Sequence, residues 1–184
     1  MRAVLVVLLL VPSLTGAASI LQASASVDDG VYSVSVGTHI NAPTATVMRT
    51  LTDYAHLTRI NPDILESRVL QVFSPTRHRV STLIRACILI FCRDVRQVQD
   101  VERLSDSHVV ADIVPELSDF RNGAAEWKLH RLQDATLLQF TARVEPDFWV
   151  PPIIGAWLFR RKIVSEMLVA SAYMETDAVA TVRP

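Results

Sequence analysis

One long apolar stripe near the C-terminus constrains the fold more than any other feature of the sequence. After Val150-Pro151-Pro152, apolar residues recur at steps of three and four over about six helical turns. They are Ile153, Ala156, Phe159, Ile163, Met167, Ala170 and Met174. Arg160-Arg161-Lys162 and Glu166 fall in the middle of this run, and charges there oppose burial in hydrocarbon. We therefore expect a core helix that lies across a partner layer, with the three basic residues on its solvated face.

Strands are the partner layer that the preceding sequence offers. Residues 32–40 alternate between apolar and polar side chains, which is the period of a half-buried strand. From about Glu66 to Glu145 the pattern predicts successive strands joined by short turns, which favours an antiparallel meander. The expected breakers are Ser74-Pro75, Ser105-Asp106, Asn122-Gly123 and Gln133-Asp134.

Two short helices are expected between the first strand and the meander. Pro43 suits a first helical turn, and the second helix is expected between Asp53 and Pro62. The sequence thus predicts an α+β domain with helices at both ends of the chain.

Charge and cysteine content exclude several classes of protein. The 184 residues fit one domain, and 18 Lys+Arg against 19 Asp+Glu leave a net charge of −1. A general nucleic-acid binder needs a basic excess, so no nucleic-acid partner is expected. Two cysteines are too few for a disulfide-framework protein or a four-thiolate zinc site.

The N-terminal 25 residues have the pattern of a secretory signal peptide. Arg2 precedes an unbroken apolar run over residues 3–11, which Pro12 closes. Small residues follow at positions 16–18 and 23–25, so we expect cleavage between about residues 18 and 25. An uncleaved membrane anchor is the alternative. The expected mature domain spans residues 26–184 and is exported to the periplasm.

No catalytic or metal-binding motif is recognisable. The five histidines do not have the spacing of metal ligands, and no nucleophile motif or glycine-rich phosphate loop is present. We therefore expect no metal, no cofactor and no catalytic residue. Asp53-Tyr54 is the best polar pair near a helix end, although Asp53 is more simply explained as a helix cap.

Cys87 and Cys92 flank an apolar stretch between two predicted strands. On one straight strand they would lie about 17 Å apart, too far for a disulfide. If the chain turns between them, they face each other within bonding distance, so we predict the bond, with two free thiols as the alternative. The turn then exposes Ile88, Leu89, Ile90 and Phe91. Exposed apolar tips mark contacts with a membrane or a partner, unless the tip folds back over the interior.

Three groups of residues resemble the START-type polyketide cyclase/dehydrase and coenzyme Q-binding family, part of the helix-grip superfamily of the birch-pollen allergens. The opening signature is Ile40-Asn41-Ala42-Pro43, Val47, Leu51-Thr52-Asp53-Tyr54, Leu57 and Asn61-Pro62. A late hairpin is Trp127-Lys128-Leu129 with Thr136-Leu137-Leu138, and the entry to the last helix is Val144-Glu145-Pro146 with Phe148-Trp149-Val150-Pro151. Met48 departs from the pattern, because many members carry Trp there.

The resemblance implies a helix-grip fold, in which a curved antiparallel sheet of about six or seven strands wraps a long C-terminal helix. It also implies a cavity for hydrophobic small molecules between sheet and helix. The side chains expected to line it are Thr82, Ile84, Trp127, Phe140, Ala142, Val144, Phe159, Ile163 and Met167. The same side chains would also fill a dry core.

Three functions are compatible with this interpretation. The leading one is a binding or carrier protein for a lipid, quinone or isoprenoid, with the apolar tip touching the membrane. The alternative is a polyketide cyclase or dehydratase that uses the same cavity, which would need a positioned acid or base. The carrier is favoured because the sequence nominates no inward-facing His, Glu or Lys. A scaffold without a cavity is the third.

Overall fold

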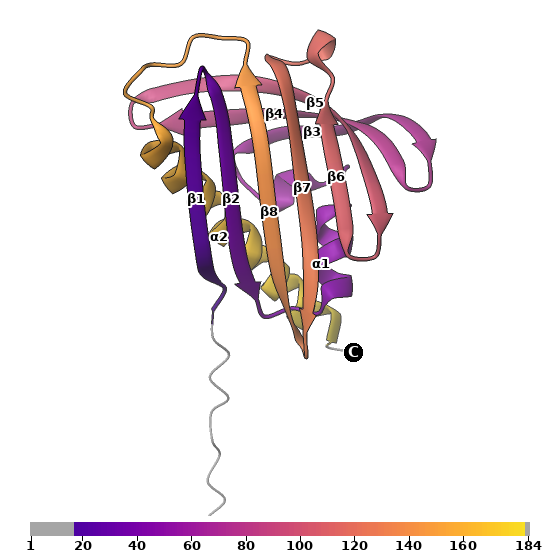
Figure 1. Ribbon diagram of the computed structural model, residues 1–184. Helices are drawn as coiled ribbons and strands as arrows, with labels where there is room; N and C mark the ends of the chain where they lie inside the picture. Colours follow the sequence, from indigo (N-terminus) through magenta and orange to yellow (C-terminus); the bar gives the residue numbers. More distant parts are fainter. Residues whose placement is uncertain (1–16, 183–184) are drawn as a thin grey trace, which may run out of the picture.

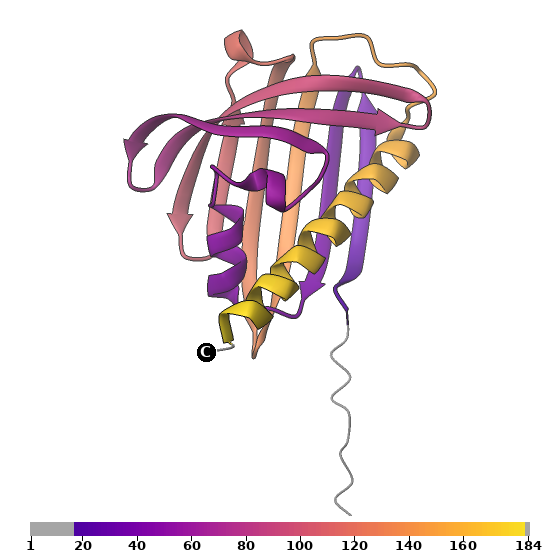
Figure 2. The same ribbon diagram turned by 180° about the vertical axis from the view of Figure 1, so that it is seen from behind.

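Eight antiparallel strands form one sheet, and a long helix crosses its concave face (Figure 1, Figure 2). This computed structural model describes residues 17–182. The sheet order is β1-β2-β8-β7-β6-β5-β4-β3. The strands are β1 Ser19–Asp28, β2 Val31–Ile40, β3 Ile64–Ser74, β4 Arg77–Ile88, β5 Phe91–Ser105, β6 His108–Ile113, β7 Phe120–Leu132 and β8 Ala135–Pro146. The helices are α1 Thr44–Leu51 and α2 Ala156–Val182, with short 3₁₀ turns η1 Leu57–Arg59 and η2 Pro115–Leu117.

The predicted helix-grip fold is confirmed, with eight strands where six or seven were expected. Strand β1 is the addition, and it lies where the small residues suggested a cleavage site. It pairs with β2 from Ser19 opposite His39 to Asp28 opposite Val31. Asp29 and Gly30 both adopt positive φ in the two-residue turn between them, as a tight hairpin requires. The apolar run of the expected signal, residues 3–11, lies outside the described residues.

The two expected short helices differ in extent. Helix α1 begins directly after Pro43, as expected, whereas the second is only the single turn η1. None of the helices within residues 17–182 combines the length and apolarity needed to cross a membrane.

Asn122-Gly123 is not a strand break, contrary to the expectation from its sequence. Both residues lie inside β7, beside a register shift between Phe120 and Asn122. A Cβ atom at Gly123 would lie 2.8 Å from Cγ1 of Ile113 and 3.1 Å from the carbonyl oxygen of Arg143. Glycine is therefore needed here because neighbouring strands approach closely, and not because the chain turns.

A cluster of buried residues, the closed core, fills one end of the space between sheet and helices. It joins α1, the middle strands and the C-terminal half of α2. Its members are Ile40, Ala42, Val47, Met48, Tyr54, Val80, Val101, Val109, Ala111, Leu129, Leu138, Met174 and Ala178. The Glu175 carboxylate on α2 accepts hydrogen bonds from the backbone and side-chain nitrogens of Asn41, at 2.8 and 2.9 Å. These bonds fix the C-terminal half of α2 to the corner between β2 and α1.

The N-terminal part of the apolar stripe differs from expectation at two positions. Ile153 precedes α2 and is 64% exposed, while the neighbouring Ile154 is buried. Lys162 does not lie on a solvated face with Arg160 and Arg161 but is half-buried and ion-paired. The helix therefore directs one of its three basic residues toward the sheet.

Candidate functional site

The N-terminal half of α2 faces the concave side of the sheet without the tight packing of the closed core. The helix lies close to β1 and β2 and approaches β4, whereas its backbone stays farther from the central strands β5–β8. We call the facing surfaces the sheet–helix interior and define it by the nine side chains expected to line a cavity. On the sheet these are Thr82, Ile84, Trp127, Phe140, Ala142 and Val144, and on the helix Phe159, Ile163 and Met167.

Strand register places the six sheet residues on one face. Phe140 pairs with Trp127, and their rings lie 5.3 Å apart. Of the nine side chains, only Thr82 is buried, and the other eight keep part of their surface exposed. On the helix, Phe159 packs edge-on against Tyr32 at 5.2 Å, and the Tyr32 hydroxyl donates to the Ile154 carbonyl at 3.2 Å. The beginning of α2 is therefore held at β2, while the apolar walls beyond it remain partly open.

Two hollows lie elsewhere on the molecule. One of about 300 Å³ lies between the α1–η1 link and the β3–β4 turn. The other, of about 450 Å³, lies between β1 and the start of α2. Neither is lined by any of the nine residues, so an enclosed cavity in the sheet–helix interior stays a prediction.

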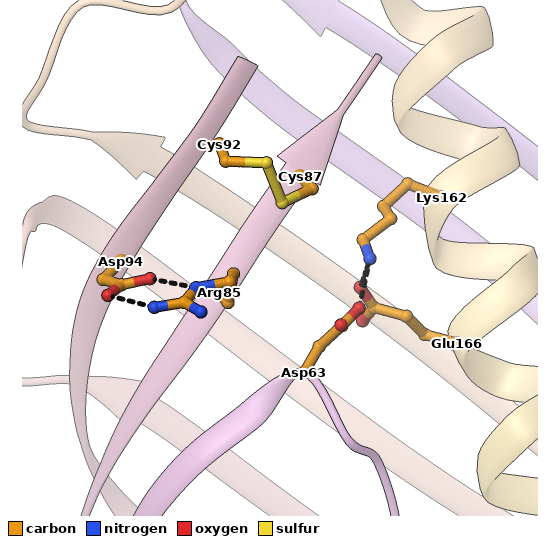
Figure 3. Close-up of a disulfide and its surroundings, with 7 residues drawn as sticks. All are labelled: Asp63, Arg85, Cys87, Cys92, Asp94, Lys162 and Glu166. Carbon is orange, nitrogen blue, oxygen red and sulfur yellow. Dashed lines mark hydrogen bonds and ion pairs between the residues drawn. A yellow bond between two sulfur atoms is a disulfide. The ribbon is translucent and has the colours of Figure 1, made fainter. Parts of the chain in front are cut away.

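A charged cluster borders the sheet–helix interior (Figure 3). Lys162 bonds to the carboxylate of Asp63, just before β3, and to Glu166 one turn along α2 at 3.0 Å. Burial raises the pKa of Glu166 above its ordinary value, although Lys162 opposes this effect. Burial would lower the pKa of Lys162, but its hydrogen bonds to Asp63 and Glu166 outweigh that and raise it.

Sequence reasoning missed this cluster although a signal was present. Lys162 and Glu166 continue the three- and four-residue steps of Phe159, Ile163 and Met167, so they share the inward face of α2. The expectation that the basic residues 160–162 lie together on a solvated face overlooked that Lys162 lies on the inward face of the helix. The statement that no inward-facing Glu or Lys can be named is corrected by these two residues.

Polar side chains on the strands face the same interior. Gln97 pairs with Thr82 across β4 and β5, and Gln99 lies two residues further on the same face. Both glutamines are half-buried. The Thr82 hydroxyl donates to the Gln97 backbone carbonyl at 3.3 Å, so this bond does not involve the Gln97 side-chain amide. Neither glutamine was identified from the sequence.

The predicted disulfide is confirmed at the end of the β4–β5 hairpin (Figure 3). Cys87 and Cys92 pair across the strands, and Ile88 pairs with Phe91 beyond them. The turn itself is Leu89 and Ile90, and Ile90 is 89% exposed. The tip therefore projects from the molecule and does not fold back.

The hairpin tip lies beside the segment that joins β8 to α2, as both ribbon views show (Figure 1, Figure 2). The Arg93 guanidinium lies 4.6 Å from the Phe148 ring and connects the two. Together they form a surface that we call the apolar end. Its exposed large side chains are Leu89, Ile90, Phe91, Trp149, Ile153 and Trp157. Arg160 and Arg161 follow directly, and the Arg161 guanidinium lies 5.6 Å from the Trp157 ring.

Residues 17–182 hold no group of three or more His, Cys, Asp and Glu side chains suited to a metal ion. His56 pairs with Asp53 at 2.8 Å on the exposed α1–η1 link, outside the sheet–helix interior. The polar pair singled out in the sequence is thus divided, because Asp53 is exposed and bonded to His56 while Tyr54 belongs to the closed core.

Solved structures share this fold at low sequence identity. A START superfamily protein from Mycobacterium smegmatis is 17% identical, with a TM-score of 0.64 over 82% of this chain and 99% of that one. A protein from Thermus thermophilus is 20% identical, with a TM-score of 0.61 over 82% and 99%. The ZhuI aromatase/cyclase from Streptomyces sp. R1128 is 13% identical, with a TM-score of 0.63 over 83% and 96%. At these identities the likeness concerns the fold alone.

Comparison at the level of sequence families is more specific. Comparison with curated proteins found no match. The family model described as polyketide cyclase/dehydrase and lipid transport matches residues 32–174, which include all of β2 except its first residue, every later strand and most of α2. The chain therefore belongs to the polyketide cyclase/dehydrase and lipid transport family.

Proposed function

We propose that this protein binds a hydrophobic small molecule of the lipid, quinone or isoprenoid type in the sheet–helix interior and carries it. The observation that carries the proposal is the partial exposure of eight facing side chains. A ligand that removed the remaining surface of these aromatic and aliphatic groups from water would lower the free energy of the complex. The same sheet face is buried at the closed core, so the partial exposure of these walls is a local property.

The polar groups at the rim would orient such a ligand. Lys162, Glu166 and the Gln97 amide can donate to or accept from a headgroup or ring carbonyl, while the apolar part lies against Phe140 and Ile163. A few polar groups in an apolar site fix orientation more than they add affinity.

Filling the interior tests the proposal. Ala142→Trp places a large ring on the concave face, and Thr141→Trp places the same ring on the outer face of β8. After purification, native mass spectrometry and solvent extraction should recover an apolar compound from the wild type and from Thr141→Trp, but not from Ala142→Trp. Both variants should remain folded.

Two results would contradict ligand binding. An empty wild-type protein that also fails to take up added quinone or phospholipid excludes a carrier. Strong destabilisation by Ala142→Trp alone would mean that side chains already fill the space, because overpacking a dense core costs about 1–3 kcal/mol.

A cyclase or dehydratase is the second candidate, and Glu166 is the observation that favours it. A carboxyl group whose pKa burial raises can stay protonated and act as a general acid, with Lys162 beside it. Glu166→Gln should abolish turnover of a poly-β-ketone analogue while the variant still binds the analogue. If the wild type binds the analogue without converting it, the carrier remains and the enzyme is excluded.

The apolar end supports the further proposal that the carrier meets an anionic membrane. Tryptophan side chains favour the bilayer interface, and Arg93, Arg160 and Arg161 around them suit anionic headgroups. Ile90→Ser should reduce co-sedimentation with phosphatidylglycerol vesicles about tenfold. Leu70→Ser, at an exposed leucine of β3, should leave it unchanged. Equal loss in both variants, or equal binding to phosphatidylcholine vesicles, would contradict this docking mode.

Export to the periplasm is part of the proposal, supported by the disulfide, which persists in oxidising compartments. Strand β1 favours cleavage at the early end of the expected range, because cleavage after Ala25 would remove most of it. The Ala18 backbone nitrogen already lies 3.2 Å from the Glu175 carboxylate, so a new α-ammonium group there would gain an ion pair. N-terminal sequencing of the exported protein should begin within residues 18–19, and a start at Ser26 would refute this.

A further inference from the structure

The hollow of about 300 Å³ lies outside the sheet–helix interior and shares no residue with it. Thr52, Asp53 and Tyr54 of the α1–η1 link form one wall, and Thr76 of the β3–β4 turn forms another. Strands β4 and β5 contribute His78 and Arg103. These two residues lie on the sheet's concave face, but the closed core separates them from the N-terminal half of α2.

Three polar groups in this hollow lack hydrogen-bond partners within residues 17–182. Arg103 is half-buried, and its guanidinium makes no ion pair or hydrogen bond with any residue in the described part of the chain. Nδ1 of His78 is buried and has no hydrogen-bond partner within residues 17–182. The Tyr54 ring packs against the His78 ring at 5.4 Å, and its hydroxyl likewise has no acceptor in that range.

The backbone that carries Arg103 is held in place, and the Tyr54 phenol stays protonated. The Arg103 backbone nitrogen donates to the Thr76 carbonyl at 2.8 Å, which fixes β5 against the β3–β4 turn. Burial raises the pKa of Tyr54 to about 12, although the nearby Arg103 charge opposes the rise, so the phenol remains a donor at neutral pH. Among the described residues, Asp53 is the only acidic one that lines the hollow, and its carboxylate already bonds to His56.

We propose that this hollow is a binding site for a small oxyanion, a phosphate or carboxylate group, held by Arg103 together with Tyr54 and His78. A guanidinium group presents several donors in a plane that matches such groups. An oxyanion would also satisfy the buried imidazole nitrogen, and leaving such a nitrogen unbonded is costly. The volume suits one compact group or the polar end of a larger molecule. This site would act independently of ligand binding in the sheet–helix interior.

Titration with inorganic phosphate, followed by backbone amide NMR, tests the site. Saturable shifts are expected around residues 52–55, 76–78 and 103, and Arg103→Gln should weaken binding at least about tenfold. Arg103→Lys should restore part of the affinity, because it returns the charge without the planar donor set. Arg59→Gln removes an exposed arginine of η1 and should change nothing.

Further arms separate the sources of the anion. Tighter binding of short-chain phosphatidic acid than of phosphate would identify a lipid headgroup, whereas equal affinity would identify a free anion, and acetate tests carboxylates. If Arg103→Gln does not fold, Tyr54→Phe, which removes only the hydroxyl, should still weaken phosphate severalfold. The proposal is overturned if none of these anions gives a saturable shift, or if Arg103→Gln, or Tyr54→Phe in its place, binds phosphate as the wild type does.

Discussion

The two halves of α2 meet the same face of the same sheet in opposite ways. Near its C-terminus, Met174 and Ala178 are buried against α1 and the central strands. Near its N-terminus, Phe159 and Ile163 face apolar strand residues and stay only half-buried. This difference in burial arises from α1, because α1 fills the space between the sheet and α2 only near the C-terminus of α2. An amphipathic stripe of uniform character can therefore be buried as core in one half and stay partly exposed in the other.

Alanine substitutions at two positions on β8 should show the largest difference in stability between these two regions. Leu138 is 1% exposed in the closed core, and Phe140 lies two residues away on the same face. Leu138→Ala should lower the free energy of unfolding by about 3 kcal/mol, and Phe140→Ala by about 1 kcal/mol. Chemical denaturation measures both. Equal losses in the free energy of unfolding would show that the two regions are packed alike and would contradict the contrast between them.

Removal of the disulfide should have the next largest effect. The double variant Cys87→Ala/Cys92→Ala should lose about 2 kcal/mol, because the bond closes a short loop in the unfolded chain. Hydrogen exchange should increase at the hairpin tip while the closed core keeps its protection. Faster exchange in β2 and β8 as well would mean that the open region supports the closed one.

The pH dependence of stability should give the smallest effect. The pKa of Glu166 is raised above its ordinary value of 4.5, so between these two values the folded chain binds more protons than the unfolded chain. Wild-type stability relative to Glu166→Gln should therefore fall as the pH rises above 4.5 and level off above the raised pKa. Thermal unfolding across this range measures the difference. A gap that stays constant with pH would place Glu166 in water, outside the interior.

The sequence predicted the elements whose pattern is set by one periodicity. The structure contains the elements predicted from the alternation along β2 and β8 and from the stripe of α2. These patterns were informative because each element has a single buried face. The cysteine pair was also predictable, since strand length allowed the bond only if the chain turned between the two residues. These inferences need local geometry alone.

The features that the sequence did not predict depend on residue types that fit two structures or on contacts between distant segments. Alanine and serine at positions 23–25 fit both a cleavage site and an edge strand, so β1 was overlooked. Gly123 is required by a contact with Ile113, which no local pattern encodes. The proposed anion site combines Tyr54, His78 and Arg103 from three separate segments, and only tertiary structure brings them together.

The disulfide makes the β4–β5 hairpin a single mechanical unit. Its strands, of 12 and 15 residues, run as one strap across the sheet and end beside the first turn of α2 (Figure 2). The disulfide between Cys87 and Cys92 joins the two strands near the hairpin tip, so they cannot separate there. A movement of this hairpin would therefore bend it near its base and carry the exposed apolar tip along as one rigid unit.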